Sequence, residues 1–243
     1  MLVVAKSAND GALLERVGVP RLHFFNAVAP NLAVMTLDVT HLMRLDRESP
    51  LLPDSEPAGF AFRFLAPDEV RNFAEPQNEL TTKFANRVEN GRDFCFAALS
   101  GDRLAGYAWY AIGSIKAEHN RGKNLNSGVA MSLPDGMAFM YKGFVHPKFR
   151  GAGLYGYINA KALQRLETCG VTTMISTADW TNWAALNCCW RLGYQDLGLV
   201  WRVGWGRVML TRAPSKGKTV GIRFAGDALV HPRTEKTIQF AVS

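Results

Sequence analysis

The chain has 243 residues, of which 48% are hydrophobic, enough to bury a core and to exclude global disorder. Its apolar runs are too short to cross a membrane, and the first residues do not read as a signal peptide. The formal charge of +7 favours an anionic partner: a nucleotide cofactor, an acidic carrier protein, nucleic acid or a lipid surface. Nucleic acid is the weaker choice, because no helix-turn-helix or aromatic-basic RNA signature is present.

The N-terminal part is the hardest to assign. Residues 1–55 are apolar, but neither a helical nor a strand period dominates them. The proline-rich stretch 48–59 reads as a connector, so we divide the chain near residue 55. We expect an N-terminal extension over 1–55, a catalytic domain over 56–212 and a basic tail over 213–243. The tail includes one candidate strand at 237–242.

The middle of the chain has clearer periods. Alternating phenylalanines predict a strand over 59–66, and Pro67 with the acids after it begins a helix. A second helical stretch runs over 80–88 and ends at Gly91. Two strands joined by a tight turn are predicted within 93–113, followed by a polar segment at 114–127.

The second half alternates strands and helices. A strand at 136–145 precedes a helix whose apolar stripe is Leu154, Ile158, Ala162 and Leu166. A strand at 171–178 then leads to a helix capped by Thr181, and a hairpin turns at 204–206. This order predicts an α/β protein with a mixed sheet flanked by helices.

A glycine-rich turn, "VHPKFRGAGLYG", joins the strand at 136–145 to the following helix. Glycines let the backbone approach a ligand, and unpaired amides at a helix start attract phosphate, so a pyrophosphate site is one reading. Lys148 and Arg150 add positive charge. A plain tight connection is the other reading, because such turns are common. Neither the nucleoside triphosphatase phosphate loop nor a dinucleotide fingerprint is present.

Two motifs together resemble the GNAT superfamily of N-acetyltransferases. Arg150 and Gly153, after a Val145-x-Pro147 strand end, are similar to its coenzyme A loop. Downstream, "NWAALNCCWRLGY" is similar to its Asn-x-x-Ala…Gly-Phe segment. The resemblance covers roughly residues 58–212 and implies a twisted, mostly antiparallel sheet with two splayed strands. Tyr155 departs from the pattern, which has glycine or alanine there.

The resemblance implies transfer of an acyl group from acetyl-CoA, or another acyl-CoA, to a small-molecule or amino-acid-like amine. In the resembled family's arrangement, backbone amides near Phe144 and Val145 would bind the thioester carbonyl, and the side chain of Asn182 would bind the pantetheine. The pyrophosphate would be bound by the residues of the turn: Arg150, Gly151, Ala152, Gly153, Leu154 and Tyr155.

Catalytic groups are harder to assign. The resembled family often has an acidic tyrosine where this chain has Cys189, and a buried core cysteine is the favoured alternative there. Tyr141 and Asp179 are the candidate bases, with His146, Glu118 and His119 as further choices. Trp180 and Trp183 flank the second motif and could border an apolar pocket.

The four cysteines, Cys95, Cys169, Cys188 and Cys189, lack metal-ligand spacing, so we expect reduced thiols, no metal and a cytoplasmic protein. Two other functions stay open. One is long-chain acyl transfer from acyl-CoA or an acidic acyl carrier protein, and the other is a non-catalytic binding protein of the same fold. The N-terminal extension would form a homodimer surface or cover the acceptor site.

Overall fold

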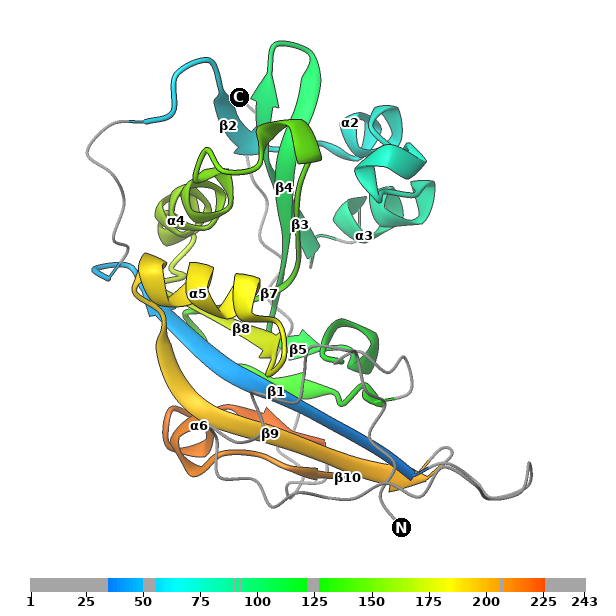
Figure 1. Ribbon diagram of the computed structural model, residues 1–243, viewed down its shortest axis with the longest axis vertical. Coiled ribbons are helices and arrows are strands. Elements are labelled where there is room, and N and C mark those ends of the chain that lie inside the picture. The colour runs from blue at the N-terminus through cyan, green and yellow to red at the C-terminus, as the bar shows by residue number, and fades with distance from the viewer. Residues whose placement is uncertain are drawn as a thin grey trace.

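The computed structural model describes residues 35–49, 56–89, 91, 93–121, 127–205 and 208–225. Their main feature is an 8-stranded sheet in the order β10-β9-β1-β8-β7-β4-β3-β2. In chain order its strands are β1 (Met35–Asp46), β2 (Ala61–Phe64), β3 (Asp93–Ser100), β4 (Arg103–Ile112), β7 (Met137–Val145), β8 (Thr173–Asp179), β9 (Gln195–Trp205) and β10 (Val208–Arg212). Only β7 and β8 pair in parallel, which confirms the predicted mixed, mostly antiparallel sheet (Figure 1).

Helices α4 (Leu154–Glu167) and α5 (Trp183–Leu192) lie together on one face of this sheet (Figure 1). The predicted stripe of α4 is fully buried, and it packs against apolar side chains of the sheet. On α5, Cys189 and Leu192 join the same core cluster. The helical period read from the sequence therefore identifies the packed face of α4 correctly.

The opposite face is covered in two parts. Helices α2 (Pro67–Asn72) and α3 (Ala85–Glu89) pack over β3, β4 and the end of β7. A smaller sheet, ordered β11-β6-β5, covers the other part, and α6 (Ser215–Thr219) contacts β9. The strands of the smaller sheet are β5 (Ser114–Ile115), β6 (Met131–Ser132) and β11 (Arg223–Phe224). These elements are connected by short 3-10 helices: η1 (Pro76–Asn78), η2 (Thr82–Phe84), η3 (Ala117–His119) and η5 (Pro147–Phe149).

Strand β1 comes from the segment that the sequence assigned to the N-terminal extension. It pairs with β8 over 40–46 and with β9 over 35–44, so it lies inside the main sheet. Val39, Leu42 and Met43 are buried. Leu42 and Met43 are adjacent in the strand, so their side chains point to opposite faces of the sheet. A strand covered on both faces shows no alternation, which explains why its period was unreadable. Residues 1–34 and the candidate strand at 237–242 lie outside the described residues.

Two local predictions differ from the structure. The helical stretch at 80–88 is divided into η2 and α3, and it follows Glu79, whose φ of 51° is left-handed. The cap of α5 is Asn182 and not Thr181, because the Asn182 side chain accepts a hydrogen bond from the Ala185 amide at 3.2 Å.

All four cysteines are free. Among the described residues, no helix has the length and apolar character needed to span a bilayer.

Candidate functional site

A groove opens where β7 and β8 separate. The two strands pair only over Met137–Met140 and Thr173–Ser176. Beyond that point β7 continues with β4 alone, and β8 continues with β1 alone. A cavity of about 740 Å³ lies between the separated ends, within the usual range for ligand pockets. The predicted pair of splayed strands is therefore present.

A β-bulge lies in β7 at the closed end of this groove. Trp109 of β4 pairs with Lys142, while the next residue, Tyr110, pairs with Met140, so Tyr141 is the extra residue. The side-chain alternation of a regular strand is interrupted at the bulge. Tyr141 and Lys142 both turn toward the side covered by α2 and α3.

The glycine-rich turn forms the open end of the groove. Gly151 and Gly153 have φ of 88° and 71°, values that favour glycine, and an added Cβ at either would meet nothing within 4 Å. Gly153 caps α4 without any side-chain hydrogen bond to the helix amides. Arg150 donates from Nε to the Val145 carbonyl at 3.2 Å, which ties the turn to β7. A 14-residue helix thus presents uncapped amides to the cavity, as an anion site requires.

The end of β8 and the start of α5 form the second wall. Asn182 and Asp179 both line the cavity. The Asp179 carboxylate accepts hydrogen bonds from the Thr181 amide at 2.8 Å and the Thr181 hydroxyl at 2.5 Å. Asp179 therefore helps to turn the chain into α5, and its role as a base stays a prediction.

Tyr155, the departure from the resembled motif, is accommodated by a glycine on β7. Its ring lies so close to Gly143 that a Cβ there would be 2.4 Å from Tyr155 Cε2. The Tyr155 hydroxyl reaches Met140 Sδ at 3.9 Å, and burial raises its pKa well above the ordinary value. The bulky side chain is thus a wall of the groove that packs into the space left by the missing Gly143 side chain.

Gly143→Ala is expected to destabilise the fold by about 1–3 kcal/mol, because the rigid Tyr155 ring has to shift. Urea denaturation measures the loss. Gly156→Ala is the matched control, since its Cβ would make an ordinary 3.5 Å contact with Leu192 and alanine favours a helix. Equal stability of Gly143→Ala and the native chain would contradict this packing.

Cys189 lines the cavity but belongs to the core. Its side chain is 2% exposed in the α4–α5 cluster, and burial raises its pKa to about 12. The thiol is therefore fully protonated at neutral pH, so it could donate a proton but not act as a base. The geometry fits the core alternative, and its role as an acid stays a prediction.

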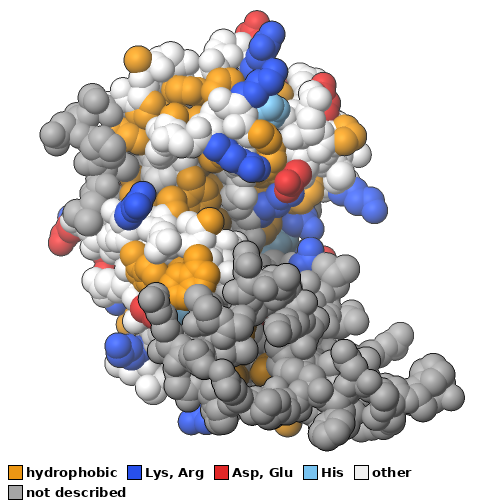
Figure 2. Space-filling view, viewed as in Figure 1, with side chains coloured by type: hydrophobic (Ala, Val, Ile, Leu, Met, Phe, Trp, Pro, Cys, Tyr) orange, Lys and Arg blue, Asp and Glu red, His pale blue; other side chains and the backbone are white. Residues whose placement is uncertain are grey.

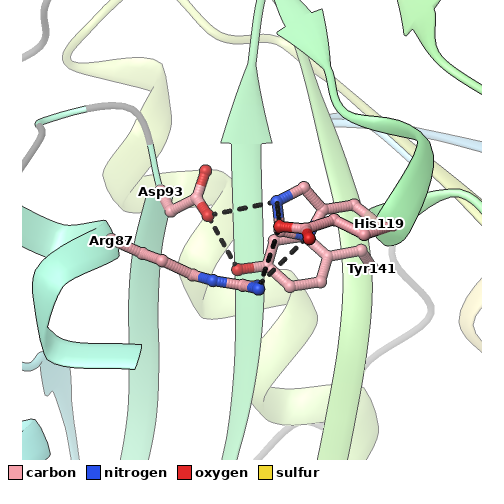
Figure 3. Close-up of polar contacts among 5 residues, drawn as sticks. Arg87, Asp93, His119 and Tyr141 are labelled. Carbon is pink, nitrogen blue, oxygen red and sulfur yellow. Dashed lines mark hydrogen bonds and ion pairs between the residues drawn. The ribbon is translucent and has the colours of Figure 1, made fainter. Parts of the chain in front are cut away.

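A cluster of polar side chains surrounds Tyr141 (Figure 3). The Tyr141 hydroxyl donates to Asp93 Oδ2 at 3.0 Å, and Asp93 Oδ2 lies 3.5 Å from His119 Nε2. Arg87 approaches His119 Nδ1 at 3.3 Å and Glu118 at 3.1 Å. Arg87 comes from α3, Asp93 from the start of β3, and Glu118 and His119 from η3, so elements far apart in sequence meet beside the groove.

His119 is expected to make stability fall as the pH is lowered. Burial, the largest cause, and then the Arg87 charge lower its pKa from 6.5 to about 4. The contribution of neutral His119 to the free energy of unfolding is therefore complete above pH 6.5. As the pH falls toward 4, the free energy of unfolding decreases by about 3 kcal/mol in total. Urea denaturation at several pH values should show a steeper decline for the native chain than for His119→Gln. Parallel curves would contradict the neutral, buried imidazole.

Most of the predicted site residues meet at this cavity. Its lining includes all three catalytic candidates and every predicted cofactor residue except Ala152. Trp180 and Trp183 are absent from the lining, and Trp183 instead packs against Trp190 on the outside of α5.

The sequence did not point to Asp93, Arg87 or Lys142. Lys142 Nζ donates to the Glu79 carbonyl at 2.6 Å above the rings of Phe84 and Tyr107, and burial lowers its pKa. No local motif marks these residues, since the fold alone brings Lys142 to the groove and Asp93 and Arg87 to Tyr141.

Lys and Arg side chains are spread over the face shown in Figure 2 and do not form one continuous patch. Among the described residues, no group of three or more His, Cys, Asp or Glu side chains is placed to hold a metal ion.

No known protein family matches the sequence, and no curated protein matches it either. Solved structures do resemble its fold. One is a GCN5-related N-acetyltransferase from Kribbella flavida, with 17% identity, a TM-score of 0.47 and coverage of 70% of this chain and 60% of that one. Another is an acetyltransferase of the GNAT family from Colwellia psychrerythraea, with 13% identity, a TM-score of 0.46 and coverage of 70% of this chain and 56% of that one.

A tandem GNAT protein from the clavulanic acid biosynthesis pathway gives 16% identity, a TM-score of 0.46 and coverage of 87% and 61%. The match therefore spans between 56% and 61% of the length of these three proteins. At this level of identity the likeness concerns the fold alone: the chain is similar in fold to GNAT acetyltransferases.

Proposed function

We propose that the protein is a coenzyme A-dependent N-acyltransferase that transfers an acyl group, most simply acetyl, from the thioester to a small-molecule amine. The observation that carries this proposal is the groove between β7 and β8, which ends at the uncapped start of α4. It combines a slot for an extended pantetheine arm with a site for a pyrophosphate.

The dimensions of the groove support an extended cofactor. Its β7 wall runs from Val145 to Met140, which at about 3.3 Å per residue gives roughly 17 Å. With the pyrophosphate at the α4 terminus and near Arg150, an extended arm would bring the thioester beside the bulge at Tyr141, which is deeper in the groove than the Phe144 and Val145 amides expected from the sequence. Asn182 faces the same slot from α5.

The reaction follows from the groups at that end. Backbone N–H groups of β7 that lose their partner where β8 departs would polarise the thioester carbonyl. The acceptor amine would approach from the side covered by α2, α3 and η3, where the polar cluster of Tyr141 lies. Direct attack of the amine on the thioester needs no covalent enzyme intermediate.

Isothermal titration with acetyl-CoA tests the proposal, and saturable binding is the expected result. Arg150→Glu should weaken binding about tenfold or more, because a negative charge replaces a positive one beside the phosphate site. Arg165→Glu, exposed in the last turn of α4, is the matched control and should bind like the native chain. Absence of saturable binding by the native chain would refute the function.

Two further measurements on the same protein identify the length of the acyl group and the amine acceptor. Titration with octanoyl-CoA, and with an acyl carrier protein, separates acetyl transfer from long-chain transfer. Release of the coenzyme A thiol in the presence of a panel of primary amines then reports turnover, and a chain that binds without turnover would be a binding protein.

A further inference from the structure

We propose that the proton of the acceptor amine leaves through the Tyr141 hydroxyl to the Asp93 carboxylate, which His119 and Arg87 hold in position. The inference rests on the proposed function and assigns its missing base. It is drawn from the polar cluster in Figure 3, whose groups come from α3, β3, η3 and β7.

Tyr141 connects the cluster to the cavity. It lines the groove, and its hydroxyl donates to Asp93 Oδ2 at 3.0 Å. A phenol has one hydrogen to donate, and here that hydrogen points to the carboxylate. Arg87 also donates a hydrogen bond to the Tyr141 oxygen, which leaves one of its lone pairs to accept a hydrogen bond from an amine bound in the groove.

Asp93 has the properties of a proton acceptor. It is 8% exposed, and desolvation is the main reason why its pKa lies above the ordinary value. The hydrogen bond from Tyr141 and the charges of Arg87 and Lys116 oppose this rise, while Glu118 adds to it. A carboxylate whose pKa is raised toward neutrality takes a proton more readily than an exposed one.

His119 is a positioning residue, and its contacts define its tautomer. The Arg87 guanidinium can only donate, so His119 Nδ1, 3.3 Å from Arg87 Nη1, is the accepting nitrogen. The hydrogen is then on Nε2, which lies 3.5 Å from Asp93 Oδ2. Since the imidazole stays neutral down to a pKa of about 4, it orients the carboxylate without competing for the proton.

Charged groups from α3 and from the segment around η3 face Asp93 and His119. Arg87 of α3 forms an ion pair with Glu118 at 3.1 Å, and the charges of Lys116 and Arg121 beside η3 also act on His119. The cluster thus holds compensating charges around one carboxylate that is connected to the groove by a phenol.

The step balances as follows. The amine nitrogen bonds to the acyl carbon, and the carbon–sulfur bond breaks with its electron pair going to sulfur. The amine proton passes to the Tyr141 oxygen while the phenol proton passes to Asp93 Oδ2. The thiolate then takes a proton from solvent, and Asp93 releases its proton to solvent, which restores the enzyme.

The test uses the full chain, acetyl-CoA and the primary-amine panel, with thiol release measured against pH. In the native chain, kcat/KM should fall on the acid side as Asp93 becomes protonated. Asp93→Asn should lower the rate by about 100-fold or more and remove this limb, while acetyl-CoA binding measured by titration stays within about twofold. Asp68→Asn, an exposed acid of α2, is the matched control.

Two further variants separate a relay from a structural role. Tyr141→Phe keeps the ring but removes the hydroxyl, and it should lower the rate comparably with binding unchanged. His119→Phe should move the acid limb to higher pH, because the carboxylate loses the Nε2–H group that faces it at 3.5 Å and favours its charged form.

Each outcome has a definite meaning. Loss of acetyl-CoA binding by the native chain refutes the proposed function. Binding and turnover with an unchanged rate and pH profile in Asp93→Asn and Tyr141→Phe overturn the relay alone. Binding without turnover of any amine overturns the relay and leaves a cofactor-binding protein.

Discussion

Ala185→Trp is expected to weaken acetyl-CoA binding by about 100-fold or more. Ala185 lines the cavity on α5, so an indole there would occupy the slot assigned to the pantetheine arm. A loss of that size corresponds to about 2.7 kcal/mol of binding free energy. Titration with acetyl-CoA measures the affinity, and thermal unfolding of the free chain checks that the fold is retained.

Asn187→Trp provides the matched control on the same helix. Asn187 is exposed and does not line the cavity, so tryptophan there adds the same ring without filling the slot. Its affinity should equal that of the native chain. Unimpaired binding in Ala185→Trp would place the cofactor outside the β7–β8 groove.

Arg202→Met is expected to destabilise the protein by about 3–5 kcal/mol. Arg202 is 0% exposed and donates to Thr40 Oγ1 at 2.9 Å and to Asn120 Oδ1 at 2.8 Å. It also lies directly opposite Asp38 in the β1–β9 register, and Asp38 is only 5% exposed. Removing the guanidinium leaves these buried acceptors unsatisfied and the Asp38 charge less compensated.

Urea denaturation measures this loss, and Arg44→Met is its control. Arg44 pairs with Asp46 at 2.9 Å where both side chains are over a quarter exposed, so its loss should cost below about 1 kcal/mol. The double variant Asp38→Leu with Arg202→Met should recover part of the stability, because no buried charge then stays uncompensated. Equal stability of Arg202→Met and the native chain would contradict the account.

The elements of one groove wall were predictable because their signals are local, whereas the separation of β7 from β8 was implied only by the resemblance. A strand, a glycine-rich turn and an amphipathic helix follow one another over 136–170, and α4 and the cavity wall lie there as expected. The positive φ of Gly151 and Gly153 can be expected from the sequence, because glycine is the residue that adopts this conformation most readily.

The rest depended on long-range contacts. Asp93 reads as the first residue of an ordinary strand, and only the fold brings it to Tyr141, 48 positions later. The bulge at Tyr141 contains no glycine or proline to mark it, so the sequence predicts one continuous strand over 136–145. Likewise, β1 has no readable period because both of its faces are buried.

The position of β1 determines when the sheet can be completed during synthesis. Its partners begin at Thr173 and Gln195, more than 120 residues after it. A nascent chain therefore exposes an apolar strand with two unpaired edges until most of the sequence has been made. We expect slow, late folding and a chain that aggregates when it is truncated before β8, because closing such long loops comes before any pairing of β1.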